Sequence, residues 1–224
     1  MRKSLRLNLR RLLNAFGDVR DDLVAGFRNG GDLRKATAGR TGLFLHVGCG
    51  PRVFDTWINI DLVPSAKGAI WFNALNGLDI ADGAVRRIHC EHFLEHLEQG
   101  EADAFLRECA RVLETGGTMR VIVPDLKKYI DAYVGDDRAF FGKLERLGGA
   151  VEPLATRALV CNQMFRMGGA HAFAWDFETL ERAARRAGFS SITPSEWNKP
   201  AVPPAIDGDD DWRLIESLFA ELVK

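Results

Sequence analysis

The stretch that decides the fold is LFLHVGCGPRVFDTWINID, residues 43–61. Residues 43–47 form a nearly continuous apolar run, which is typical of a buried parallel strand. Gly48-Cys49-Gly50 follows, and glycine lets the chain turn sharply and lets a ligand approach the backbone closely. A second predicted strand, 56–61, ends in Asp61, whose carboxylate can accept hydrogen bonds from both hydroxyls of a ribose. The order strand, glycines, strand, acid therefore predicts a ligand site at the ends of two neighbouring strands.

The remaining sequence continues this alternation of strands and helices. We expect further strands at 69–73, 85–90 and 118–124, and a sixth within SSITPSEW (190–197). Five apolar residues at helical spacing predict a helix that the Gly116-Gly117 pair terminates; they are Ala102, Phe105, Leu106, Cys109 and Val112. Asp176 and Gly188 bound a second helix. Alternation of this kind indicates a parallel sheet with right-handed crossovers.

Two segments depart from the simple alternation. Only residues 48–56 separate the first two strands, and a helical crossover needs about a dozen residues, so the helix expected there must be short. Residues 126–167 are mostly helical in pattern. The final segment, 211–224, fits a helix as well as a strand.

Size and charge narrow the function. The chain has 224 residues and a net charge of -1, which suits one soluble domain and gives no case for nucleic acid as a partner. The four cysteines form no C-x-x-C pair, so a disulfide framework or zinc ribbon is not indicated. No uncharged stretch approaches a membrane span of about 18 residues. The cytoplasm is the expected compartment, although the Arg-rich start leaves a transit peptide open.

Residues 1–40 carry ten basic and four acidic side chains and an apolar stripe, which predicts a basic amphipathic helix with a connector. Three interpretations of this segment stay open. It could close over the catalytic domain as a lid, it could contact an anionic membrane surface or a protein partner, or its stripe could simply pack on the domain.

Several motifs in order resemble class I S-adenosylmethionine-dependent methyltransferases. HVGCG resembles the glycine-rich first motif of that family and NID its ribose-binding acid. CEHFLEHL resembles the segment after the fourth strand. ECARVLETGGTMRVIVPDL and HAFAWDFETLERAARRAGF resemble the family's double-glycine segment and late helix. The resemblance implies a Rossmann-like methyltransferase fold over residues 41–224, namely a mostly parallel seven-stranded sheet with helices on both faces. Residues 126–175 would form a helical cover that carries acceptor specificity.

The same resemblance implies S-adenosyl-L-methionine as the cofactor and assigns residues to it by their place after each strand. The expected cofactor-binding residues are His46, Gly48, Cys49, Gly50, Asp61, Leu62, Asn73, Ala74, Leu75 and Glu91. Three positions depart from the family pattern. His46 and Asn73 stand where the family usually has acids, and Arg52 stands where it often has a third glycine.

Histidine is the natural choice for a base, because it titrates near neutral pH. His92, directly after the fourth predicted strand, and His171, on a loop before a helix, are the candidate catalytic residues. A structural role is as good an interpretation of each. The expected acceptor is a small molecule or sugar, methylated on a hydroxyl oxygen.

The alternatives to methyl transfer are a dehydrogenase, a zinc peptidase and a non-catalytic binding protein. A dehydrogenase would need G-x-G-x-x-G to hold a pyrophosphate, and no glycine lies three residues after Gly50. His92-x-x-Glu95-His96 matches an inverted zinc-peptidase motif, which on a helix would place both histidines on one face. Its position directly after a strand favours the methyltransferase, so no metal is expected at His92 and His96. A non-catalytic, methyltransferase-like binding protein is the remaining alternative.

Overall fold

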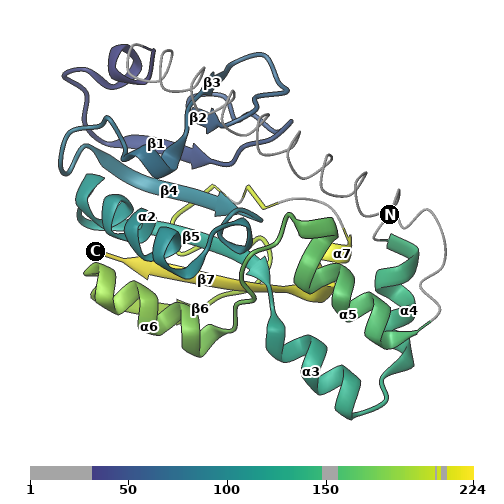
Figure 1. Cartoon of the computed structure of the whole chain (residues 1–224). Coiled ribbons are helices and arrows are strands. Elements are labelled where there is room, and N and C mark those ends of the chain that lie inside the picture. Colours follow the sequence, from purple (N-terminus) through teal and green to yellow (C-terminus); the bar gives the residue numbers. More distant parts are fainter. Residues whose placement is uncertain (1–31, 148–155, 205, 208–210) are drawn as a thin grey trace, which may run out of the picture.

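A computed structural model describes residues 32–147, 156–204, 206–207 and 211–224 of the chain. Its centre is a seven-stranded sheet in the order β3-β2-β1-β4-β5-β7-β6 (Figure 1). The strands are β1 (Leu43–Val47), β2 (Ile58–Asp61), β3 (Ala69–Trp71), β4 (Val85–Glu91), β5 (Leu113–Pro124), β6 (Ser191–Pro194) and β7 (Ser217–Val223). The first five pair in parallel, and β7 is antiparallel to both of its neighbours. This is the mostly parallel, Rossmann-like sheet that the sequence predicts.

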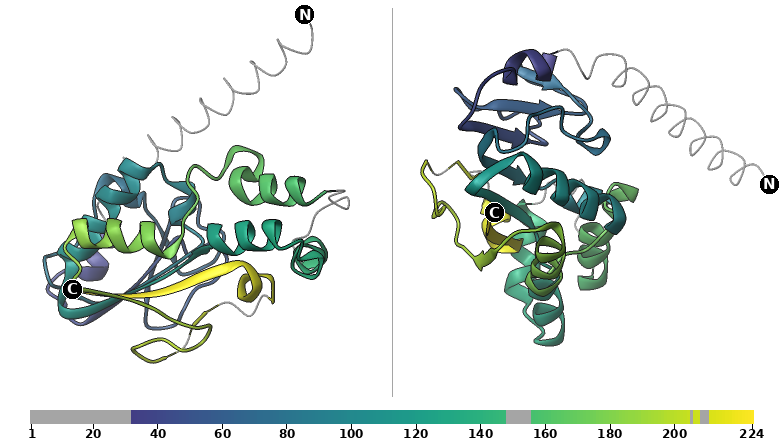
Figure 2. Two further views of the ribbon diagram at one scale, coloured as in Figure 1. Left: turned by 90° about the horizontal axis from the view of Figure 1, so that it is seen from below. Right: turned by 90° about the vertical axis from the view of Figure 1, so that its left-hand side faces the viewer.

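Helices α2 (Gln99–Val112) and α6 (Phe177–Ala187) pack beside each other on one face of the sheet (Figure 2). The five apolar residues predicted to share a face of α2 are all buried. As predicted, Asp176 caps α6 by accepting a hydrogen bond from the Thr179 backbone, and Gly188 ends it in the left-handed conformation. The buried apolar residues of α2 and α6 pack against alternate residues of β1, β4 and β5 and form the main apolar core with them.

The opposite face of the sheet is polar and aromatic. Its side chains alternate along each strand with those of the core; they are Phe44 and His46 of β1, Asn59 of β2, and Arg87 and His89 of β4. Irregular segments cover this face. Residues 52–57 contact it through Phe54 and Trp57, and residues 195–207 contact it through hydrogen bonds from two buried arginines.

Two local expectations were wrong, and one segment was left open between helix and strand. Residues 48–57 form turns and no helix, because ten residues that include Pro51 cannot complete a helical crossover. Helix α2 ends at Val112, before Gly116-Gly117, and β5 begins at once, so that both glycines lie within the strand. Residues 211–224 contain both a helix, α7 (Asp211–Glu216), and a strand, β7.

A helical insertion follows β5, and in Figure 1 it lies at the end of the sheet where the parallel strands finish. It comprises α3 (Leu126–Val134), α4 (Arg138–Leu147), α5 (Arg157–Arg166) and the 3₁₀ turn η3 (Met167–Gly169). Its buried residues form a second, smaller core; they are Tyr129, Ala132, Phe141, Leu144, Val160 and Met164. Most of the helix predicted within 1–40 lies outside the described residues. In the part that the structure describes, residues 32–37 are helical.

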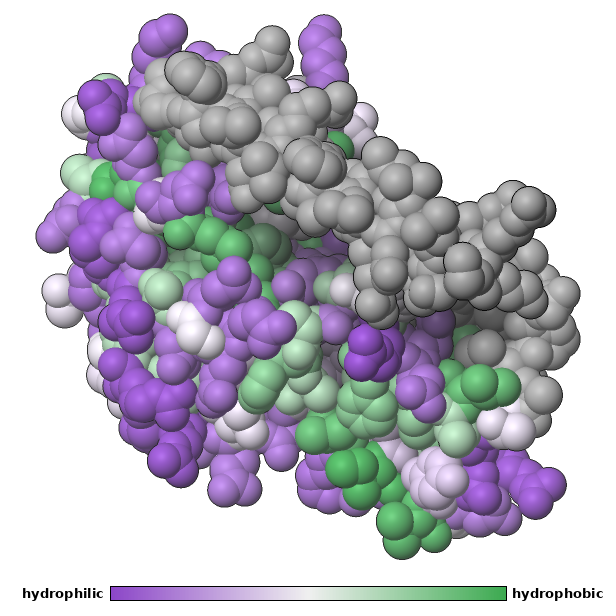
Figure 3. Space-filling model, viewed as in Figure 1, coloured by the Kyte–Doolittle hydropathy of each residue, from purple (hydrophilic) through white to green (hydrophobic). Residues whose placement is uncertain are grey.

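The surface is mostly hydrophilic, with apolar side chains gathered over α3 (Figure 3). Ile130, Tyr133 and Val134 are the large apolar residues exposed on that helix. Among the described residues, every helix is too short or too polar to cross a membrane.

Candidate functional site

The predicted glycine turn and the predicted acid meet directly. The Gly50 backbone N–H donates a 2.8 Å hydrogen bond to Oδ2 of Asp61, and the Val63 N–H donates one of the same length to Oδ1. Gly48 has a φ of +66°, and a Cβ on it would lie 2.8 Å from the Phe93 ring. Only glycine fits at Gly48, because it tolerates both the left-handed conformation and the close approach of that ring. The strand register thus produces a turn whose backbone is fixed by the acid at the end of β2.

Apolar and amide groups border Asp61 on the side of β3. Leu62 and Leu75 are 38% and 39% exposed, unusually open for leucines that follow two paired strands. Asn73 is buried, and its side-chain oxygen accepts a 2.9 Å hydrogen bond from the Leu75 N–H at the start of the 3₁₀ turn η1 (Ala74–Asn76). Ala74 is buried. Two partly exposed leucines thus follow the neighbouring strands β2 and β3.

Cys49 lies within the turn and is buried. Burial raises the pKa of its thiol to about 11, and the nearby Asp61 carboxylate adds to the rise. A thiol rather than a thiolate is therefore present at neutral pH, which does not favour Cys49 as a nucleophile.

His46 lies in the polar face of the sheet and not at the strand ends. Its ring stacks on Phe54 with the centroids 4.5 Å apart, and Nδ1 is 3.2 Å from the side-chain oxygen of Asn59. Burial lowers its pKa to about 3, and the neighbouring His89 lowers it further. His46 is therefore a neutral side chain that supports the segment after the glycine turn.

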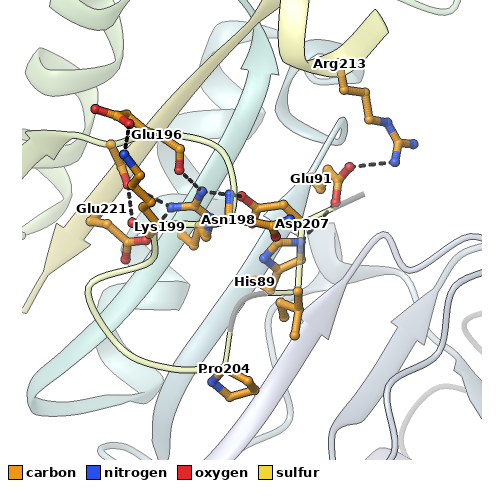
Figure 4. A network of polar contacts seen from close by, with 12 residues as sticks. His89, Glu91, Glu196, Asn198, Lys199, Pro204, Asp207, Arg213 and Glu221 are labelled. Carbon is orange, nitrogen blue, oxygen red and sulfur yellow. Dashed lines mark hydrogen bonds and ion pairs between the residues drawn. The ribbon is translucent and has the colours of Figure 1, made fainter. Parts of the chain in front are cut away.

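Glu91, at the end of β4, is engaged in charge pairs. Its carboxylate is 4% exposed and lies 2.8 Å from Nη1 of Arg52, 2.6 Å from Nη1 of Arg213 and 3.1 Å from Nε2 of His89. Figure 4 shows Arg213 and His89 approaching it from different sides. Burial opposes ionisation of Glu91, but its bonds to His89 and the arginines lower its pKa to about 2. Arg52, at the place of the family's third glycine, therefore ties the glycine turn to β4, and it also donates to the Ile206 carbonyl.

His92 follows Glu91 and has a φ of +49°, a left-handed conformation that is uncommon outside glycine. Its Nδ1 is 3.0 Å from Oε1 of Glu95, and its Nε2 is 3.0 Å from the hydroxyl oxygen of Ser217. A histidine between a carboxylate and a hydroxyl is the arrangement that orients an imidazole for proton transfer.

His171, the second candidate base, lies beside His96. The rings of His171 and His96 contact edge to face with centroids 4.9 Å apart, and one potential ligand atom each from Glu95, His96 and His171 lies within 4.8 Å of the others. Burial lowers the pKa of His171, and its Nδ1 donates to the Met164 carbonyl. The H-x-x-E-H motif occupies a bend and the 3₁₀ turn η2 (Leu94–His96), too short for His92 and His96 to share a helical face.

A network of buried charges holds residues 195–207 on the polar face (Figure 4). Arg120 of β5 is fully buried, and its guanidinium donates 2.6 Å hydrogen bonds to Asp207 and to Glu221 of β7. Arg87 donates to the Pro204 carbonyl. This network fixes the position of Ile206, whose carbonyl accepts a hydrogen bond from Arg52. Arg52 lies next to the glycine turn, so the network also supports that turn.

Four residues of the site were not singled out by sequence reasoning for the contacts they make. Arg52 was noted only as a departure, and Glu95 only as part of a motif. Arg213 and Ser217 lie far along the chain, and Ser217 is 125 residues from the His92 that it contacts. Nothing local in the sequence marks Ser217, because the antiparallel pairing of β7 with β5 is what brings it there.

Comparisons with known proteins find similarity only among solved structures. No family model matches the chain, and no curated protein matches it. It is similar to solved structures that include a protein from Nostoc punctiforme assigned as an O-methyltransferase, with a TM-score of 0.49 and 11% identity over 92% of this chain and 56% of that one. This chain thus spans just over half of the Nostoc protein.

Two further solved structures are of similar length to this chain. An S-adenosylmethionine-dependent methyltransferase from Archaeoglobus fulgidus has a TM-score of 0.47 and 15% identity, covering 91% of this chain and 94% of its own. One from Thermotoga maritima has a TM-score of 0.46 and 15% identity, covering 96% and 97%. These identities are too low to transfer a function from either protein to this chain.

Proposed function

We propose that this chain is an S-adenosylmethionine-dependent methyltransferase that methylates a hydroxyl oxygen of a small molecule or sugar. The observation that carries the proposal is the hydrogen bond from Gly50 to Asp61, which places a glycine turn and a carboxylate side by side at the carboxyl ends of β1 and β2. In open parallel sheets this edge is where ligands bind.

The residues at this edge fit the cofactor. A Cβ on Gly50 would meet nothing within 4 Å, so the turn leaves open space on its outer side. Asp61 would accept hydrogen bonds from the ribose hydroxyls, and Leu62 and Leu75 would cover the adenine. The backbone of Gly48 and Cys49 would face the methionine part. Because the cofactor has no phosphate, this short turn suffices without a third glycine.

Acceptor chemistry falls to His92 in this proposal. Bound S-adenosylmethionine supplies an electrophilic methyl group on a sulfonium, which departs as a neutral thioether. The acceptor hydroxyl would take the place of the Ser217 hydroxyl, and Nε2 of His92 would accept its proton. Glu95 keeps the ring in position from Nδ1. His171 is the second candidate base, and its Nε2 is the nitrogen that the Met164 carbonyl leaves available.

Two measurements on the purified full chain test this function. Calorimetry should detect stoichiometric binding of S-adenosylmethionine and of its demethylated product. Methyl-labelled cofactor should then transfer label to at least one member of a panel of sugars and small hydroxyl compounds. Absence of cofactor binding by the folded chain would refute the proposal.

A non-catalytic binding protein is the alternative that one observation favours. Ile130, Tyr133 and Val134 expose apolar surface on α3, which suits contact with another protein. Cofactor binding without label transfer to any acceptor, together with a protein complex lost on Val134→Asp, would favour this alternative over catalysis.

A further inference from the structure

We propose that Glu95, His96 and His171 bind a divalent first-row transition-metal ion, with zinc as the representative ion. The three side chains come from two segments, the 3₁₀ turn η2 and the loop between η3 and α6. Two imidazoles and one carboxylate are a donor set that such ions prefer. The proposal concerns metal binding alone, so it stands whether or not the chain transfers methyl groups.

The ligand atoms are near the spacing that an ion requires. They all lie within 4.8 Å of one another. Two ligands bound to a tetrahedral zinc ion at about 2.0–2.1 Å are about 3.4 Å apart. Side-chain rotations that move the ligand atoms by about an ångström would therefore bring all three within bonding distance.

Both histidines are already oriented as metal ligands. Nδ1 of His96 is 3.0 Å from the Ala170 carbonyl oxygen, and Nδ1 of His171 contacts the Met164 carbonyl oxygen. A carbonyl oxygen only accepts, so each Nδ1 carries the proton and each Nε2 keeps its lone pair. Metal-binding histidines almost always donate their other ring N–H to a carbonyl or carboxylate in this way, which fixes the ring.

Glu95 supplies an independent sign that a cation belongs here. Its side chain is buried, with 1% of the residue exposed, and Nδ1 of His92 lies 3.0 Å from Oε1. Oε2 accepts no hydrogen bond from any residue that the structure describes. Because burying a carboxylate oxygen without a partner is unfavourable, a bound cation beside Oε2 would satisfy it.

The backbone holds the two segments together and leaves the site accessible. The Glu95 carbonyl accepts hydrogen bonds of 2.8 and 3.2 Å from the N–H groups of Ala172 and Phe173, which fixes the His171 loop against η2. His96 is exposed, so an ion can enter from solvent. Three protein ligands leave at least one coordination position for water or another oxygen ligand, as in catalytic rather than structural zinc sites.

This site differs from the one that the sequence motif suggests. H-x-x-E-H would pair His92 with His96, whereas the fold pairs His96 with His171 and leaves His92 beside the carboxylate. The sequence predicts no metal ion and assigns His171 as a candidate base, so the proposed site departs from that prediction. If the ion binds, His171 acts as a ligand and His92 remains the candidate base.

The test is to titrate zinc into the metal-stripped full chain, without cofactor, and to measure binding by calorimetry. We expect one zinc ion per wild-type chain. His96→Ala and His171→Ala should each weaken binding by at least about 100-fold, since losing even a hydrogen-bond partner of a ligand costs 10–100-fold. Glu178→Gln, an exposed carboxylate on α6, and Cys161→Ser should bind as the wild type does.

Folding is checked on the same samples. His96 is exposed, so His96→Ala should keep the wild-type melting temperature in the absence of metal, while losing the rise in melting temperature that zinc causes in the wild type. Co²⁺ gives a second measurement, because its visible absorption changes when imidazole ligands replace water. A wild-type chain that binds no zinc, or zinc binding that survives both histidine substitutions, would overturn the proposal. Either result leaves cofactor binding, measured separately, unaffected.

Discussion

The Gly50 N–H donates a 2.8 Å hydrogen bond to Oδ2 of Asp61, and these two residues join the ends of neighbouring strands. The carboxylate that would hold a ribose is thus also the group that fixes the glycine turn. Its second oxygen accepts from Val63, so Asp61 organises both the turn after β1 and the turn after β2. Local order at the proposed cofactor site therefore depends on one side chain.

The two glycines of the turn should respond differently to alanine. Gly50→Ala meets only the left-handed φ of +51°, which costs about 1–2 kcal/mol. Gly48→Ala adds a clash with Phe93, so the loss in free energy of unfolding should be clearly larger. Urea denaturation of both variants measures the difference, with Gly50→Ala as the matched control. Equal losses would mean that Phe93 moves away freely and that the close approach is unimportant.

Stability should fall in acid because of His46. Its pKa in the folded protein is about 3, against an ordinary value of 6.5, so the unfolded chain binds a proton that the folded chain does not. The stabilisation is complete above pH 6.5 and is lost as the pH falls toward 3, by up to about 1.4 kcal/mol per pH unit. Denaturation at a series of pH values measures the slope.

His46→Phe supplies the control for this slope. Phenylalanine can stack on Phe54 but cannot titrate, and Asn59 keeps the Phe54 N–H as a donor to its side-chain oxygen. The slope between pH 6.5 and 4 should therefore be shallower in this variant. An unchanged slope would assign the acid sensitivity to other groups, of which His89 is the nearest buried histidine, with its pKa also lowered by burial.

Arg120 should be far more important for stability than a surface arginine. Arg120→Met leaves Asp207 and Glu221 buried without their partner and should cost about 3–5 kcal/mol. Arg186→Met removes an ion pair with Asp103 at the surface and should cost less than about 1 kcal/mol. Urea midpoints of the two variants provide the comparison. Similar midpoints would show that the segment covering the polar face, which includes Ser195 and Asp207, is held in place by contacts other than those of Arg120.

His92 should matter for turnover and not for cofactor binding. His92→Gln keeps hydrogen-bonding capacity toward Glu95 and Ser217 but cannot take a proton, so kcat should fall about 100- to 10,000-fold. The dissociation constant for S-adenosylmethionine should be unchanged, because Asp61 and the glycine turn are untouched. Ser217→Ala, which removes the hydroxyl at Nε2, should have a much smaller effect on kcat. Full activity of His92→Gln would remove His92 as the base.

Much of this fold could be predicted because its signals are local. The apolar run of β1, the acid at the end of β2 and the caps Asp176 and Gly188 are each read within a few residues, and the structure confirms them. The prediction of a helix between β1 and β2 was wrong. The short segment there instead places the rings of Phe54 and Trp57 against the polar face of the sheet. Segment 211–224 was ambiguous because the helix-to-strand change between Glu216 and Ser217 has no glycine or proline to mark it.

The site was predictable only where the sequence places residues at strand ends. Asp61 and the glycines follow from that rule, whereas the partners of Glu91 do not, because Arg52 and Arg213 come from distant segments. The pairing of His96 with His171 likewise depends on the backbone hydrogen bonds that join the Glu95 carbonyl to the loop after η3. Long-range contacts of this kind leave no pattern in a single sequence.

The most direct test of the central claim is calorimetric binding of S-adenosylmethionine to the wild type and to Asp61→Ala, with Asp55→Asn, a change at an exposed aspartate, as the control. We predict stoichiometric binding to the wild type and to the control. Asp61→Ala should bind at least about 10-fold more weakly, because hydrogen bonds to a charged group contribute about 1.5–3 kcal/mol each. Equal affinity of a folded Asp61→Ala chain, or no binding to the wild type, would contradict the account.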